Sequence, residues 1–138
     1  MSASEVVPDQ AELVREWRAL LARHAATSCV LERELGEGFG LGMSEFEVLE
    51  RLAQAPAEAA GNLRVQELAE TVHLSQSALS RLIGRLEKAG LVARAMCASD
   101  RRGIYVQLTP EGRERYEAAR PLHRAVLARM LTPQPPSH

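Results

Sequence analysis

The sequence predicts a mainly α-helical fold that carries one small antiparallel β-hairpin. Apolar residues recur at helical spacing along most of the chain, whereas strict alternation is confined to Ile104, Val106 and Leu108. The run from Ser75 to Thr109 begins as a helix with polar and basic residues on one side and continues as a hairpin with two arginines at its tip. This layout suits the grooves of duplex DNA better than it suits a substrate pocket.

The predicted helix that follows Ser75 is amphipathic. Its apolar residues fall at i, i+3, i+4 and i+7 and should be buried together: Leu79, Leu82, Ile83 and Leu86. The outward side then carries Ser77, Ser80, Arg81, Gly84 and Lys88. Ser75 is placed to cap the N-terminus of this helix, and Gly90 is placed to end it. The first three turns lack Asp and Glu, although the helix dipole favours acids there, so a DNA phosphate could take that role.

The segments on either side of this helix complete the pattern. A short helix over residues 65–73 precedes it, and the two predict a helix-turn-helix, although an ordinary helical hairpin in a core is an equally good interpretation of that pair alone. Strands predicted over residues 91–96 and 104–108 follow, joined by the polar turn CASDRRG. A hairpin directly after a recognition helix is a wing. Its tip would bring Arg101 and Arg102 to the minor groove, with Asp100 holding an arginine in place, whereas the alternative is a solvated turn with a weak ion pair.

These motifs resemble those of the MarR family of winged-helix transcriptional regulators. The family's wing pattern, D-x-R followed by an apolar strand and L-T, is matched by Asp100, Arg102, Val106, Leu108 and Thr109. The run LSQSALSRLIGRLEKAGLV is similar to the family's recognition helix and the start of its wing. Over roughly residues 10 to 131, the resemblance implies a winged helix-turn-helix with N- and C-terminal dimerisation helices. It also implies a homodimer on a pseudo-palindromic operator, with recognition helices in successive major grooves of double-stranded DNA and wings in flanking minor grooves.

The resemblance extends to individual residues and to the organisation of the chain. It implies that Arg102 enters the minor groove and that Asp100 orients it. The full set of expected DNA-binding residues is Ser75, Gln76, Ser77, Ser80, Arg81, Arg85, Lys88, Asp100, Arg101 and Arg102. We expect residues 1–43 to form an N-terminal dimerisation helix and linker, residues 44–108 the DNA-binding domain, and residues 109–138 a C-terminal dimerisation helix with a short tail.

Charge and composition agree with a DNA-binding protein. Between Ser75 and Tyr105, six basic residues accompany two acidic ones, while the whole chain of 138 residues has a net charge of −1. One basic surface on an acidic body is expected where a single face meets DNA, although the preference for arginine over lysine can equally reflect GC-rich coding. No apolar run approaches the ~20 residues of a membrane span, and no signal peptide opens the chain. We therefore expect a cytoplasmic protein without membrane contact.

The remaining elements are predicted from caps and apolar stripes. The first helix should begin after Asp9 and end in a run of glycines, Gly36, Gly38, Gly40 and Gly42. Its stripe comprises Leu13, Trp17, Leu20, Leu21, His24 and Leu31. Ser44 and Glu47 form a predicted capping box for the next helix, a loop follows over residues 53–61, and residues 63–65 form a short third strand. Thr109 and Pro110 open the last helix.

An effector site follows from the family resemblance. Family members often bind small aromatic or anionic molecules in a crevice between the dimerisation helices and the DNA-binding lobe, and the ligand shifts the spacing of the recognition helices. A repressor released by such an effector is therefore the expected function. The crevice could be lined by Trp17, His24, Phe46 and Leu49, which are equally suited to plain core or dimer packing.

The sequence supports other functions less strongly. A redox-sensing regulator would use Cys97, which has arginines nearby, or Cys29. A winged-helix protein-interaction module would favour an apolar or acidic outward helix face, and the sequence shows the opposite. We expect no enzyme, because Ser75, His73 and Asp100 lack a nucleophile elbow. We also expect no cofactor and no metal site, because the four histidines lack the short spacings of zinc ligands.

Overall fold

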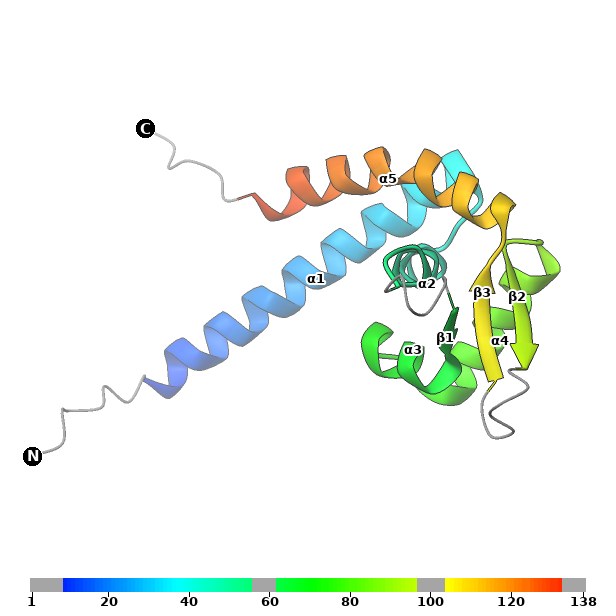
Figure 1. The fold of residues 1–138 in the computed structure, drawn as a ribbon. Helices are drawn as coiled ribbons and strands as arrows, with labels where there is room; N and C mark the ends of the chain where they lie inside the picture. The colour runs from blue at the N-terminus through cyan, green and yellow to red at the C-terminus, as the bar shows by residue number, and fades with distance from the viewer. Residues whose placement is uncertain (1–8, 56–61, 97–103, 133–138) are drawn as a thin grey trace, which may run out of the picture.

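The computed structural model describes residues 9–55, 62–96 and 104–132. Along the chain the elements are α1 (Gln10–Phe39), α2 (Met43–Ala53), β1 (Asn62–Arg64), α3 (Val65–Val72), α4 (Gln76–Lys88), β2 (Val92–Met96), β3 (Ile104–Leu108) and α5 (Pro110–Leu131). Helices α2, α3 and α4 gather with the sheet into one lobe, while the N-terminal half of α1 extends away from that lobe (Figure 1). The mainly helical fold with one small antiparallel sheet confirms the predicted fold class.

Helix α1 is longer than the glycine pattern suggests. It continues to Phe39 and ends at Gly40, whose backbone is left-handed with φ of 66° and whose N–H donates to the carbonyl of Gly36 at 3.1 Å. Gly36 and Gly38 therefore lie inside the helix, so the prediction that the glycine run ends it was wrong for these two positions. The left-handed C-terminal position is the one that a glycine satisfies without strain, and it occurs once in this run.

Within the described residues, only the C-terminal half of α1 is buried against other elements. Its buried residues are Thr27, Leu31 and Leu35, and α5 is the element that lies along this half (Figure 1). On α5 the buried residues are Gly112, Tyr116, Ala119, His123 and Val126. The apolar stripe of the N-terminal half of α1 remains exposed at Leu13, Val14, Trp17, Leu20 and Leu21. None of the helices that the structure describes combines the length and hydropathy needed to cross a membrane.

Helix α2 begins two residues earlier than the predicted capping box implies. Gly42 is its N-cap, and the carboxylate of Glu45 accepts a hydrogen bond from the Gly42 N–H at 2.6 Å. The box predicted from Ser44 and Glu47 is therefore wrong in register. Glu47 instead pairs with Arg51 one turn later, at 3.3 Å. The tertiary path of the chain decides where α2 begins, because Gly42 adopts the extended backbone of an N-cap while Ser44 is already helical.

The sheet has the strand order β1-β3-β2 and is antiparallel throughout. Leu63 and Arg94 are both register partners of Val106, from the two sides of β3. The predicted third strand is confirmed, shifted by one residue because Val65 already belongs to α3. Val106 is fully buried, so the apolar face of the sheet closes the core beside α2.

The core is centred on α2 and α4. Its fully buried side chains include Phe46, Val48, Leu49 and Leu52 from α2, Leu79 and Ile83 from α4, Leu68 from α3 and Leu35 from α1. Burying a leucine or phenylalanine side chain contributes roughly 1.5–3 kcal/mol. The position of α4 relative to α1 and α2 is thereby determined by the same packing that stabilises the domain.

Candidate nucleic-acid interface

Helix α4 presents the polar face that the sequence predicts. Leu79, Leu82, Ile83 and Leu86 are buried, whereas the expected DNA-binding residues on this helix are all exposed, namely Gln76, Ser77, Ser80, Arg81, Arg85 and Lys88. The first turn carries no acid, and the last turn carries Arg85 and Lys88. The exposed face thus combines hydrogen-bonding groups near the N-terminus with cations towards the C-terminus, which is the residue composition used to contact bases and phosphates.

The turn before α4 brings its N-terminus to the surface. His73 ends α3 in the left-handed conformation with φ of 58°, and the Leu74 N–H donates to the Ala69 carbonyl at 3.4 Å. Ser75 is extended, and its Oγ accepts a hydrogen bond from the Ala78 N–H at 3.2 Å. The predicted cap at Ser75 is confirmed. Since one of the first N–H groups of α4 is used by this cap, the others remain available to an anion at the helix N-terminus.

The base of the wing is attached to α4 through Arg94. This residue lies on β2, and its guanidinium donates to the Ser80 carbonyl at 3.4 Å and lies 3.5 Å from the Glu87 carboxylate. Both partners belong to α4, so Arg94 holds one side of that helix against the hairpin. The expected wing-tip residues Cys97, Asp100, Arg101 and Arg102 lie outside the described residues.

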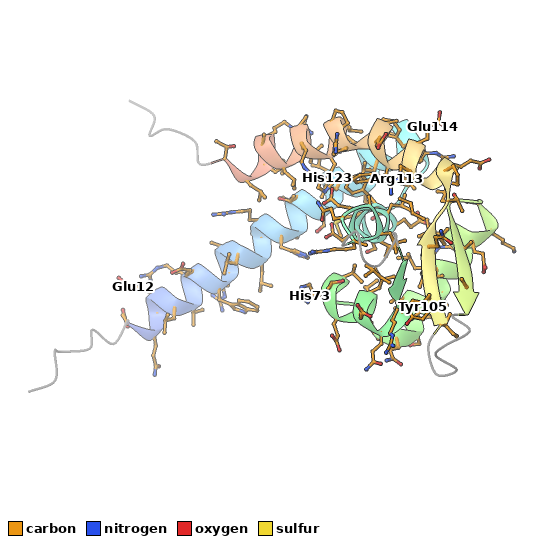
Figure 2. The ribbon with its side chains drawn as sticks, in the orientation of Figure 1. Glu12, His73, Tyr105, Arg113, Glu114 and His123 are labelled. Atoms are coloured by element: carbon orange, nitrogen blue, oxygen red, sulfur yellow. The ribbon has the colours of Figure 1, made fainter. Side chains whose placement is uncertain are left out.

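A second contact supports the outer strand of the sheet. Arg64 on β1 donates from Nε to the Tyr105 hydroxyl at 3.1 Å, and its guanidinium carbon lies 5.5 Å from the centre of the Tyr105 ring. Tyr105 is on β3, near the end of the hairpin that leads to the wing tip (Figure 2). The sequence pattern did not single out either residue, because they are 41 positions apart and their pairing depends on the β1–β3 register.

Arg85 differs from the other expected DNA-binding residues. Its Nε lies 3.7 Å from the Glu45 carboxylate at the N-terminus of α2, on the flank of α4 opposite Arg94's contact with Ser80. By contrast, none of the ion pairs among the described residues involves Arg81 or Lys88. The exposed cations of α4 therefore fall into two groups, one with an internal carboxylate partner and one without.

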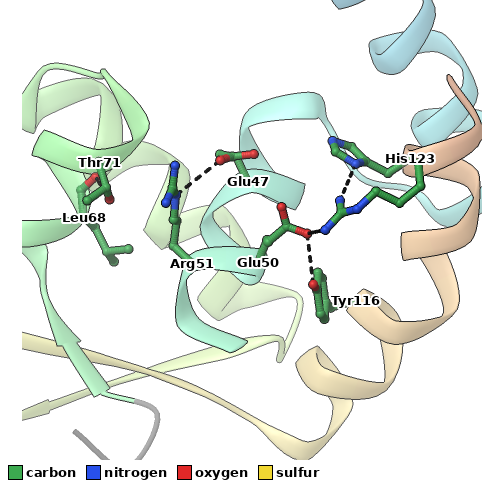
Figure 3. A network of polar contacts seen from close by, with 8 residues as sticks. Glu47, Glu50, Arg51, Leu68, Thr71, Tyr116 and His123 are labelled. Carbon is green, nitrogen blue, oxygen red and sulfur yellow. Dashed lines mark hydrogen bonds and ion pairs between the residues drawn. The ribbon is translucent and has the colours of Figure 1, made fainter. Parts of the chain in front are cut away.

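A buried polar network joins α2 to α5 (Figure 3). The Glu50 carboxylate accepts hydrogen bonds from the Tyr116 hydroxyl at 2.9 Å and from Arg124 at 2.6 Å. Arg124 also donates to Nδ1 of His123 at 2.7 Å, because a guanidinium offers no acceptor. The His123 ring stacks on Phe46 with centroids 4.3 Å apart. A signal for this network existed in the sequence, since Glu50 lies one helical turn after Phe46 on the buried face of α2.

Burial and hydrogen bonding oppose each other in this network. Burial by itself would raise the pKa of Glu50, but the hydrogen bonds from Arg124 and Tyr116 outweigh it and leave that pKa below its usual value. Burial, and then the neighbouring Arg124 charge, lower the pKa of His123. Burial and the bond to Glu50 raise the pKa of Tyr116. The network therefore favours an ionised Glu50 and a neutral His123.

A cavity of about 440 Å³ adjoins this network. It lies between α1, α2, α3 and α5 and is lined by Leu31, Met43, Ser44, Glu47, Glu50, Arg51, Thr71, Val72, His73, His123, Arg124 and Leu127. The four residues expected to line an effector crevice are placed elsewhere. Trp17 is 59% exposed and His24 is exposed on the free half of α1, whereas Phe46 and Leu49 are fully buried in the core. Trp17 lies about 20 Å along the helix from Leu31, so this single chain does not bring the four together.

The remaining candidates for a site are the two cysteines and any group of side chains that could hold a metal ion. Cys29 is exposed on α1, and Cys97 is not described. Among the described residues, no group of three or more His, Cys, Asp or Glu side chains is arranged to hold a metal ion.

Known proteins are similar to this chain in sequence and in fold. A family model described as MarR family matches residues 39–103. The HTH-type transcriptional repressor MdtR of Bacillus subtilis is 38% identical over 72 residues, which cover 52% of this chain and 46% of MdtR. The matched region thus spans about half the length of that relative. The HTH-type transcriptional repressor Rv2887 of Mycobacterium tuberculosis is 35% identical over 99 residues, which cover 69% of this chain and 68% of the relative.

Solved structures extend the match to nearly the whole chain. The MarR family regulator Sco3205 of Streptomyces coelicolor, determined in complex with DNA, is 30% identical with a TM-score of 0.82, covering 96% of this chain and 82% of Sco3205. NadR in complex with 4-hydroxyphenylacetate is 25% identical with a TM-score of 0.59, covering 94% and 81%. These two curated relatives are transcriptional repressors, which agrees with the expectation of a regulator rather than an enzyme. The chain belongs to the MarR family of winged-helix transcriptional regulators.

Proposed function

We propose that this chain is a sequence-specific transcriptional repressor that places α4 in the major groove of duplex DNA. The observation that carries the proposal is the exposed face of α4, which holds Gln76, Ser77, Ser80, Arg81 and Lys88 without an acid in its first turn. The determination of Sco3205 in complex with DNA supports the same use of this fold. Arg101 and Arg102 would follow the wing into the minor groove, with Asp100 orienting Arg102.

The test is a selection of duplex fragments from the source genome at ~150 mM salt, followed by sequencing of the retained DNA. An enriched pseudo-palindrome with half-sites about one helical turn apart would support a dimeric operator-binding protein. Retention without a shared motif would instead indicate backbone binding alone and would contradict the proposal.

A matched pair of variants tests the groove assignment. Lys88→Gln removes one cation from the α4 face, so the slope of log affinity against log salt should fall by about 0.9. Arg113→Gln removes an exposed cation from α5, at the end of the sheet away from Tyr105 (Figure 2), and should leave the slope unchanged. Equal slopes for both variants and the parent would show that α4 does not approach phosphate.

The proposed functional unit is a homodimer. The stripe Leu13, Val14, Trp17, Leu20 and Leu21 is exposed along half of α1, and contiguous apolar surface of this kind marks interaction sites in soluble proteins. Sedimentation at micromolar concentration should show a dimer for the parent and a shift towards monomer for Trp17→Glu. Glu12→Gln, an exposed change at the start of α1, is the control. A monomeric parent would contradict this part of the proposal.

Release by a small aromatic or anionic effector is the second part of the proposed function. The 440 Å³ cavity supports it, because the cavity contacts both the DNA-binding lobe and α5. Its lining includes two histidines and two arginines, Arg51 and Arg124, which pair with the carboxylates of Glu47 and Glu50 and which an anionic ligand would have to win from them. NadR was determined with 4-hydroxyphenylacetate, which makes that compound a reasonable first probe. Calorimetric titration with phenolic acids should give heat that Arg51→Gln weakens. Absence of heat across the series would count against an effector of this class.

A further inference from the structure

We propose that Arg85 is a positioning residue, which orients the recognition helix by pairing with the N-terminus of α2 and does not bind phosphate. The proposal rests on the proposed function, because it concerns how α4 is presented to DNA. It separates Arg85 from Arg81 and Lys88, with which the sequence pattern groups it.

Two carboxylates converge where α1 turns into α2. Glu45 accepts from the Gly42 N–H at 2.6 Å, and Glu32, from α1, accepts from the Met43 N–H at 3.2 Å. A Cβ at Gly42 would lie 3.0 Å from a Glu32 oxygen and 3.2 Å from a Glu45 oxygen, so both carboxylates crowd one backbone position. The helix dipole favours negative charge at this end of α2, but two carboxylates so placed also repel each other.

Arg85 supplies the opposing charge. Its Nε lies 3.7 Å from Oε2 of Glu45, the oxygen that does not accept from Gly42. Among the residues that the structure describes, Arg85 is the basic residue that forms an ion pair with either of these two carboxylates. The same groups line one cavity together with Leu82, the buried neighbour of Arg85 on α4. The contact joins α4 to α2, and the hydrogen bond from the Met43 N–H to Glu32 joins the same end of α2 to α1.

The position of Arg85 around α4 explains why it faces α2 and not solvent alone. At about 100° per residue, Arg85 is roughly 60° from Lys88 and 140° from Ser80 on the helix surface. Ser80 is the residue whose carbonyl accepts from Arg94 of the wing. Helix α4 is thus held on one flank by β2 and on the other by the corner of α1 and α2. A recognition helix held in this way loses less orientational freedom on binding, which favours affinity without a contact to DNA.

The test compares operator affinity and its salt dependence for the parent, Arg85→Gln, Glu45→Gln, the double variant and Lys88→Gln. Glutamine at position 45 keeps an oxygen for the Gly42 N–H while removing the charge. We expect Arg85→Gln and Glu45→Gln each to weaken operator binding about two- to fivefold, the range for an exposed ion pair. The double variant should bind no worse than either single one. Arg85→Lys should recover most of the affinity, and the salt slope should stay at the parent value for every variant except Lys88→Gln.

The opposite assignment, in which Arg85 contacts DNA, predicts different changes in the salt slope and in operator affinity. If Arg85 binds phosphate, Arg85→Gln will reduce the salt slope by about 0.9, as Lys88→Gln does. In that case Glu45→Gln will leave operator affinity unchanged or raise it, because it removes a carboxylate that competes for the arginine. Either result overturns the proposal. If the parent itself shows no operator preference, the proposed function fails, whereas a loss of slope at Arg85 alone refutes only the positioning role.

Discussion

Replacing Gly112 by alanine should destabilise this protein, although the same change in an ordinary helix is stabilising. Gly112 lies in the first turn of α5, where alanine is favoured over glycine by up to ~1 kcal/mol. A Cβ built at this position would lie 2.0 Å from the Leu91 carbonyl oxygen and 2.8 Å from a Leu108 methyl carbon. Ordinary contact begins near 3.4 Å. The start of α5 would therefore have to move away from the end of α4 and the base of the wing.

The expected cost follows from that displacement. A movement of about 1.4 Å cannot be absorbed by a flexible side chain, because the nearest atom belongs to backbone, and interiors are packed without free space. The Gly112 N–H also donates to the Thr109 Oγ at 3.0 Å, and Thr109 donates to the Gly90 carbonyl at 2.7 Å, so both bonds would be strained. Overpacking of this kind costs about 1–3 kcal/mol or somewhat more, a large part of the ~5–15 kcal/mol stability of a small domain.

Urea unfolding followed by circular dichroism at 222 nm measures this effect. Gly36→Ala is the matched control, because Gly36 lies inside α1 and a Cβ there would meet no atom within 4 Å. We expect Gly36→Ala to raise the free energy of unfolding by about 0.5–1 kcal/mol and Gly112→Ala to lower it. A Gly112→Ala protein as stable as the parent would refute the close approach of α5 to Leu91.

The remaining predictions concern the caps and the buried network. Thr109→Ala should lower the free energy of unfolding by about 1–2 kcal/mol, measured by the same urea titration, because the α5 cap and the bond to Gly90 are both lost. Glu50→Leu should cost about 1–3 kcal/mol, because it leaves the buried Tyr116 hydroxyl without its acceptor; Tyr116→Phe combined with Glu50→Leu should recover part of that loss. Acid should destabilise the protein in two steps. In the folded protein the pKa of His123 lies below 6.5, so its contribution to the free energy of unfolding is complete above pH 6.5 and is lost as the pH falls below that value. Glu50 has a folded pKa below 4.5, so its contribution is lost only below pH 4.5. His123→Phe should remove the first step, and a pH profile identical to that of the parent would contradict the burial of a neutral imidazole.

Local sequence determined the buried face of α4, the caps of α4 and α5 and the position of β3. The spacing of Leu79, Leu82, Ile83 and Leu86 decides which face of α4 is buried, because helical periodicity places them on one side whatever they pack against. Ser75 and Thr109 cap their helices through side-chain oxygens that act within three residues. Strand alternation likewise places Val106 and Leu108 on the buried face of β3, whereas Ile104 at the far end of the strand is exposed.

Contacts between elements distant in sequence were decided by the tertiary structure alone. The spacing of Arg85 groups it with the cations of α4, and only the packing of α4 against α2 brings it to Glu45, 40 positions earlier in the chain. The same is true of Glu50, Tyr116 and Arg124, which meet where α5 crosses α2. Helical periodicity assigns a side chain to a face, but it does not say which element covers that face. That choice depends on how the whole chain closes its core, and here it separates the cations of α4 that face solvent from the one that pairs internally.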